Sequence, residues 1–332
     1  MTSDAPRVRL GPFFGYHISS FTFPGVPAER LFGRVIELAQ AAEAAGFGLV
    51  TVMDHFYQIR GVGSEEEPML EAYTALSGIA AQTRRVHVGA MVTGVTYRNP
   101  ALLAKTVTTL DVVSGGRAML GLGAAWNEDE HLGYGFDFPP LRERMDRLDE
   151  ALEICGRLFR EERPSFEGRH YRLTRALNRP RPLQPGGPPI MVGGGGEQRT
   201  LRIAARHADL THWFPLGREV LRHKTEVLAR YCEEIGRDPT TIQRTMAAPV
   251  VLAADEREAA LLREQAGPDG RLNAVTPAQA AEALRPYLDD GFTGFTFRNP
   301  QLPTIEGIGL AGELLQLIGW DRAATAQRTA TE

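Results

Sequence analysis

The chain has few cysteines, little net charge and no long hydrophobic run, and each shortage excludes a class of protein. Only Cys155 and Cys232 occur among 332 residues, and both stand in helical patterns without metal-type or CxxC spacing. Disulfide stapling is therefore not expected. The 37 basic and 41 acidic residues leave a net charge of −4, and no Lys/Arg cluster marks a nucleic-acid-binding face.

Long apolar segments are also missing. No run approaches the roughly 20 apolar residues that span a bilayer, and residues 1–11 contain no apolar signal-peptide core. We therefore expect a cytoplasmic protein with no nucleic-acid and no membrane partner. The 43% hydrophobic content is ample for a globular core.

Short β-branched runs alternate with longer amphipathic stretches along the whole chain, which indicates repeated βα units. Helix start signals such as Asn99-Pro100 and Thr276-Pro277 separate them. Eight such units at this length predict a single α/β domain over 1–332, a (β/α)8 TIM barrel. The expected strands are 10–15, 48–55, 86–94, 117–125, 190–193, 208–214, 245–252 and 292–298.

Three further segments are expected to be irregular. Residues 160–188 are too long for an ordinary loop and contain a Glu167-Gly168 turn, so they predict a small insertion with a hairpin before strand five. Residues 267–273 predict a polar loop, and residues 323–332 a frayed polar end. A doubly wound sheet is the rival fold, but it would place a GxGxxG loop after the first strand.

The most informative motif is PPIMVGGGGE, in which an apolar run opens into Gly193, Gly194, Gly195 and Gly196 just before a helical pattern. Backbone amides of such a loop can bind a phosphate at a helix N-terminus, and Glu197 opens that helix. A flexible strand-to-helix turn without a ligand is the alternative.

In a TIM barrel, chemistry gathers where the strands end. Asp54-His55 ends strand two, and an imidazole beside a carboxylate suits proton transfer, although a capping aspartate with a structural histidine has the same pattern. Thr93-Gly94-Val95 ends strand three, where a glycine permits a bulge or the approach of a flat ligand, or forms an ordinary turn. At the end of strand four, small residues precede Trp126 and Asn127. They either leave space for a ligand in the barrel mouth or simply fit the taper of the barrel. The nearby His131 has no assigned role.

Together with the glycine run, Asp54-His55-Phe56 and the segment RNPALLAKTVTTLDVVSGGRAMLGLGAAWNEDEHLGYG closely resemble the bacterial luciferase-like flavin and deazaflavin oxidoreductases. The resemblance covers roughly residues 10–320 and is strongest to the branch that uses coenzyme F420. It implies a deazaflavin ring in the barrel mouth, with its phosphate on the glycine loop. It also implies a non-prolyl cis peptide behind the ring, matched here to Gly94-Val95.

By the same resemblance, His55 stands beside the reactive edge of the ring, with Asp54 near its polar end and Asn127 framing the pocket. The position of the catalytic glutamate of the sugar-phosphate dehydrogenases holds Ala124, so glucose 6-phosphate oxidation is not expected. The expected reaction is hydride transfer between F420 and a small organic substrate, with His55 as the acid/base. No metal is expected, because only the Asp54-His55 pair offers ligands at a strand end.

Two alternatives stay open at this point. An FMN-dependent monooxygenase, supplied with reduced flavin by a separate reductase, would use the same glycine loop, and a non-catalytic flavin-binding protein would share the fold. The resemblance implies a homodimer. An apolar substrate with one polar handle is expected from the candidate pocket residues His17, Trp126, Trp213, Phe214 and Arg298.

Overall fold

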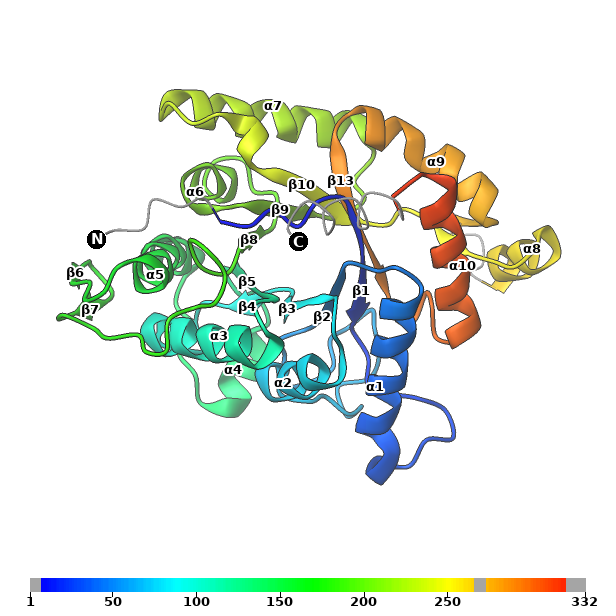
Figure 1. Ribbon diagram of the computed structural model, residues 1–332, viewed down its shortest axis with the longest axis horizontal. Helices are drawn as coiled ribbons and strands as arrows, with labels where there is room; N and C mark the ends of the chain where they lie inside the picture. Colours follow the sequence, from blue (N-terminus) through cyan, green and yellow to red (C-terminus); the bar gives the residue numbers. More distant parts are fainter. Residues whose placement is uncertain (1–6, 266–272, 321–332) are drawn as a thin grey trace.

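The computed structural model describes residues 7–265 and 273–320, so the expected end at 323–332 and all but Asn273 of the expected loop at 267–273 lie outside it. Eight parallel strands close into a barrel in the order β1, β2, β3, β5, β8, β9, β10 and β13, and β13 pairs again with β1. The predicted TIM barrel is therefore confirmed (Figure 1). The barrel strands are β1 (Phe13–Ile18), β2 (Leu49–Val52), β3 (His87–Ala90), β5 (Ala118–Gly123), β8 (Ile190–Gly193), β9 (Leu210–Trp213), β10 (Gln243–Ala247) and β13 (Phe292–Arg298).

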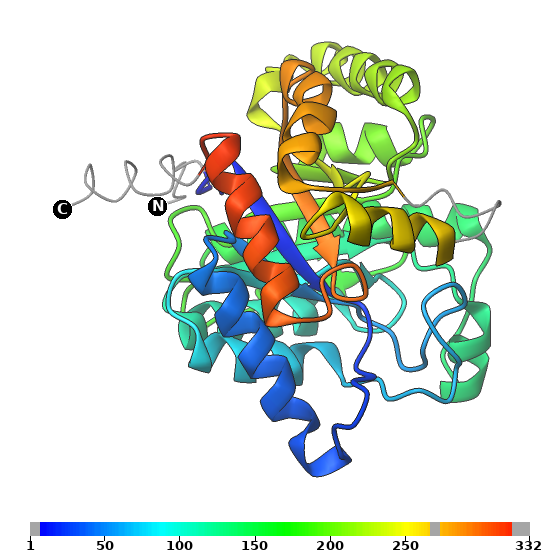
Figure 2. The ribbon, with the colours of Figure 1, turned by 90° about the vertical axis from the view of Figure 1, so that its right-hand side faces the viewer.

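Helices surround the barrel, with α1 and α2 on the opposite side from α7 in Figure 1, and α10 standing between α1 and α9 in Figure 2. The capping signals act as expected. The Asn99 side chain accepts a hydrogen bond from the Ala101 N–H at the start of α3, whose first residue is Pro100. At the start of α9, Thr276 and Gln279 form a capping box. The helices are α1 (Ala28–Ala44), α2 (Ala72–Gln82), α3 (Pro100–Ser114), α4 (Glu128–Tyr134), α5 (Leu141–Arg160), α6 (Thr200–His207), α7 (Arg218–Glu234), the 3-10 turn η1 (Pro239–Thr241), α8 (Glu256–Gln265), α9 (Pro277–Asp289) and α10 (Ile305–Leu317).

Two of the predicted strands are each divided in two. Residues 86–94 form β3 and then the separate β4 (Thr93–Gly94), which pairs with β5 beyond the end of β3. Residues 245–252 form β10 and then β11 (Val251–Leu252), which pairs with β12 (Ala274–Val275) in a small separate sheet. The first strand also lies later than expected, at Phe13–Ile18, because its pairing with β2 and β13 runs through His17.

Side-chain alternation along the strands decides which residues face the barrel interior. On β1, Phe13 packs in a small interior cluster with Leu49, Met119, Met191 and Leu210, whereas Phe14, Tyr16 and Ile18 belong to the larger core under the helices. His17 lies four residues after Phe13 and therefore also faces the barrel interior. On β9 the same rule directs Leu210 and His212 inward and Trp213 outward.

The segment before β8 contains the expected hairpin, formed by β6 (Phe166–Glu167) and β7 (Arg172–Leu173). The hairpin lies at the outer edge of the molecule, beside α5 (Figure 1). Across 7–265 and 273–320, the helices are all too short or too polar to cross a membrane.

Candidate active site

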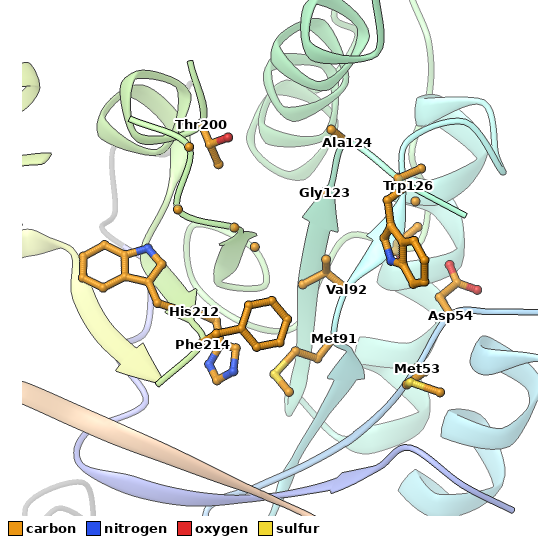
Figure 3. A pocket seen from close by; sticks show the side chains of 18 of the residues that line it. Met53, Asp54, Met91, Val92, Gly123, Ala124, Trp126, Thr200, His212 and Phe214 are labelled. Atoms are coloured by element: carbon orange, nitrogen blue, oxygen red, sulfur yellow. The ribbon is translucent and has the colours of Figure 1, made fainter. Parts of the chain in front are cut away.

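A cavity of about 1010 Å³ opens at the carboxyl ends of the barrel strands. Its walls are mainly apolar, with Trp126 and Asp54 on one side, His212 and Phe214 on the other, and Met91 and Val92 between them (Figure 3). The predicted residues that line it are His17, Asp54, His55, Thr93, Gly94, Trp126, Gly193, Gly194, Gly195, Gly196, Glu197, Trp213, Phe214 and Arg298. One site therefore collects residues from every quarter of the sequence.

His55 is held by a buried carboxylate. Its Nδ1 lies 2.6 Å from Oε1 of Glu130, a side chain with no exposed surface at the start of α4. The Phe56 N–H donates to Glu130 Oε2 at 2.8 Å, and the Tyr97 hydroxyl donates to Oε1. Burial alone would raise the pKa of Glu130, but the hydrogen bonds from His55 and Tyr97 and the charge interaction with His55 bring it below its usual range.

Asp54 is paired with Arg98. The guanidinium donates to both carboxylate oxygens, at 2.6 and 3.1 Å, and also binds Glu71 at 2.6 Å. Burial raises the pKa of Asp54, and Arg98 opposes that rise. The bidentate pair fixes the Asp54 carboxylate at the cavity wall.

Two neutral histidines line the inner part of the cavity. Burial, together with His212 and Arg298, lowers the pKa of His17 to about 3, and burial lowers that of His212 to about 4. His17 Nδ1 lies 2.9 Å from Thr51 Oγ1, and His212 Nδ1 lies 2.9 Å from Thr245 Oγ1. Because the Thr245 hydroxyl donates its hydrogen to the Thr211 carbonyl, His212 Nδ1 must donate, which leaves Nε2 as an acceptor.

The glycine loop brings bare backbone to the cavity. A Cβ on Gly193 or on Gly123 would lie 2.8 Å from Val92 Cγ2, so both positions need glycine for the close approach. Gly194 has φ +103° and donates its N–H to the His212 carbonyl. The amides of Gly195 and Gly196 donate to no backbone carbonyl in the described part of the chain, and α6 begins at Thr200. Free amides before a helix N-terminus suit a phosphate group.

The charged neighbours of this loop are already engaged. Lys224 of α7 donates to the Gly195 carbonyl at 2.7 Å and lies 3.3 Å from Glu197. Arg199, just ahead of α6, binds Asp146 and the Arg142 carbonyl on α5. Lys224 therefore supports the loop conformation, and the backbone amides of Gly195 and Gly196 are the donors that stay available to a ligand.

The expected cis peptide is present, but its predicted position is wrong. The non-prolyl cis bond joins Met91 and Val92, not Gly94 and Val95. The sequence had suggested one continuous strand to Gly94, whereas β3 ends at Ala90 and the chain turns there before β4 pairs with β5. Both Met91 and Val92 line the cavity.

Two predicted cofactor residues do not reach the cavity. Val95 is buried outside it, and Asn127 stands ahead of α4 with its carbonyl 2.5 Å from His131 Nδ1. His131 Nε2 lies 2.6 Å from Thr96 Oγ1, so this histidine ties the loop after β4 to α4. Trp213 borders the cavity but is almost fully buried against Phe292.

Sequence reasoning missed Glu130, Arg98 and His212. Inward alternation from Leu210 would have selected His212 instead of Trp213. Glu130 and Arg98 carried no comparable signal, because both follow strand ends in loops or short helices whose direction depends on the tertiary fold.

Comparison with known proteins gives the family. The family model described as luciferase-like monooxygenase matches residues 13–299, and the chain belongs to this family. An F420-dependent glucose-6-phosphate dehydrogenase of Kineococcus radiotolerans is 31% identical over 304 residues, covering 81% of this chain and 87% of the relative. An F420-dependent hydroxymycolic acid dehydrogenase of Mycobacterium tuberculosis is 32% identical over 257 residues, covering 75% and 68% of the two chains.

Solved structures agree on the fold. An F420-dependent secondary alcohol dehydrogenase in complex with an F420-acetone adduct superposes with a TM-score of 0.75 at 19% identity, covering 93% of this chain and 99% of the other. A monooxygenase from Streptomyces bottropensis superposes with a TM-score of 0.76 at 22% identity, covering 92% and 98%. At these identities the two structures establish a shared barrel and do not separate the two coenzymes.

Proposed function

We propose that this protein is an F420-dependent oxidoreductase that transfers a hydride between the coenzyme and an apolar organic substrate carrying a hydroxyl or carbonyl group. The observation that carries the proposal is one cavity lined together by the glycine loop, Val92 and His55. Relatives at 31 and 32% identity that are named F420-dependent dehydrogenases support the choice of coenzyme.

The residues present fit the coenzyme. Gly195 and Gly196 would hold its phosphate through their amides, and Val92 would support one face of the ring. Bound F420 supplies a carbon, C5, that accepts or gives up a hydride. His55 exchanges a proton with the substrate oxygen, and the apolar walls around Trp126, Met53 and Leu141 exclude water from the reacting atoms.

The substrate is inferred from the same walls. Ala124 lines the cavity and offers only a methyl group, so glucose 6-phosphate is not the substrate we propose. His17 and His212 are neutral and add uncharged hydrogen-bonding groups to the mainly apolar walls. We infer an uncharged, largely apolar alcohol or its carbonyl counterpart. A homodimer, a separate reductase and a cytoplasmic location stay predictions.

Replacing His55 with alanine tests the reaction. Turnover of F420 with a panel of secondary alcohols and ketones should fall about 100-fold or more, because a positioned acid/base contributes about 10²- to 10⁴-fold. F420 affinity, measured by fluorescence titration, should stay near that of the wild type. His207→Ala is the control, since His207 lies on α6 against Asp149 and outside the cavity.

Full turnover in His55→Ala would refute the proton-transfer role. Oxygen-dependent turnover with reduced FMN, and none with F420, would replace the proposal with the monooxygenase alternative.

A further inference from the structure

The carboxylate of Glu130 has no place in the reaction described so far, yet it binds the His55 ring directly. Its side chain is completely buried, and its two oxygens accept from His55, Tyr97 and the Phe56 N–H. Phe56 packs on Tyr97, Tyr134 and Phe136 with centroid separations of 4.8, 4.6 and 5.5 Å. The two residues that bind the carboxylate beside His55, Phe56 and Tyr97, thus belong to one aromatic cluster.

Glu130 is ionised in this setting. Three donors and its place in the first turn of α4 favour the charged form. The Tyr97 phenol stays protonated, because burial and its hydrogen bond to Glu130 raise its pKa. An ionised carboxylate can only accept hydrogen bonds, so His55 Nδ1 must carry a hydrogen.

We propose that Glu130 is a positioning residue that fixes His55 in the Nδ1–H tautomer and leaves Nε2 as the ring nitrogen available to the substrate. The inference rests on the proposed function and deepens it. When an alcohol is oxidised, its O–H proton moves to Nε2, its C–H hydrogen leaves with the electron pair to the coenzyme, and a C=O bond forms. In the reverse direction the imidazolium returns the proton to the substrate oxygen. In both directions the negative charge of Glu130 stabilises the protonated ring.

Other ionisable groups near His55 do not replace Glu130. His17 of β1 stays neutral because burial, His212 and Arg298 lower its pKa to about 3. Asp54, the preceding residue, is bound through both oxygens to Arg98. Among these neighbours, only Glu130 has a carboxylate oxygen on the imidazole.

The first test is independent of turnover. In coenzyme-free protein labelled with ¹⁵N-histidine, NMR should show Nδ1 protonated and Nε2 unprotonated in neutral His55, with the signals assigned by their loss in His55→Ala. In Glu130→Ala the Nε2–H form should appear. Tyr97→Phe removes one donor but leaves the carboxylate, so the Nδ1–H form should persist.

The second test uses the reaction. Glu130→Gln keeps the shape and loses the charge, so turnover should fall about 10-fold or more with little change in KM or F420 affinity. The pH profile of turnover should also differ from that of the wild type, because the protonated ring loses its counter-charge. Glu130→Asp keeps the charge and should restore part of the rate.

The Nε2–H tautomer in the wild-type protein, or a Glu130→Gln enzyme with wild-type rate and pH profile, would overturn the inference. If wild-type protein shows no F420 turnover, the proposed function fails, and the tautomer measurement still decides the role of Glu130.

Discussion

At the scale of single residues, two buried histidines make the folded state sensitive to mild acid. Burial, helped at His17 by His212 and Arg298, lowers the pKa of His17 to about 3 and that of His212 to about 4, far below the value near 6.5 expected in the unfolded chain. Below pH 6.5 the unfolded state therefore binds protons that the folded state excludes. The associated stability is complete above that pH and declines as the pH falls toward the folded values.

We expect each of these imidazoles to lower the free energy of unfolding by about 2 kcal/mol between pH 7 and pH 5. Urea unfolding at the two pH values measures the loss. The double variant His17→Gln/His212→Gln should lose less stability over this interval than the wild type. His223→Gln, at an exposed site on α7, is the control that should match the wild type. An undiminished loss in the double variant would contradict the assignment.

At the scale of elements, the glycine loop after β8 differs from an ordinary turn because its backbone lines the cavity. Gly194 and Gly217 both have positive φ, +103° and +86°, but only Gly194 lines the cavity. Alanine at either position should cost about 1–3 kcal/mol of stability through the backbone alone.

Gly194→Ala should in addition weaken F420 binding, because the loop amides would move from the positions that we propose for phosphate binding. Gly217→Ala should bind F420 as the wild type does. Fluorescence titration, with urea unfolding in parallel, separates the two effects. Equal F420 affinity in the two variants would show that the loop does not hold the coenzyme.

Prediction from sequence succeeded where a local signal defines the element. The bounds 190–193 and 292–298 match β8 and β13, and capping residues marked α3 and α9 correctly. It failed where pairing with a distant strand decides the boundary. Residues 86–94 read as one apolar run, yet β4 pairs with Leu122 and Gly123 of β5 after the chain leaves β3. The cis bond was misplaced by three residues for the same reason.

At the scale of the whole molecule, closure of the barrel is what assembles the site. Pairing of β1 with β13 brings His17 opposite Arg298, residues 281 positions apart in the chain. Most of the residues predicted at strand ends line the cavity, including His55, Trp126 and the glycine loop. Glu130 and Arg98 could not be found in this way, because their partners His55 and Asp54 lie 75 and 44 positions away.

The most direct measurement is to identify the coenzyme that the protein retains when it is produced in a host that makes both F420 and FMN. Absorbance and mass spectra of the purified protein should show F420, and thermal unfolding should shift upward when F420 is added, since a ligand of the folded state stabilises it. Selective retention of FMN, with no upward shift on addition of F420, would contradict the account.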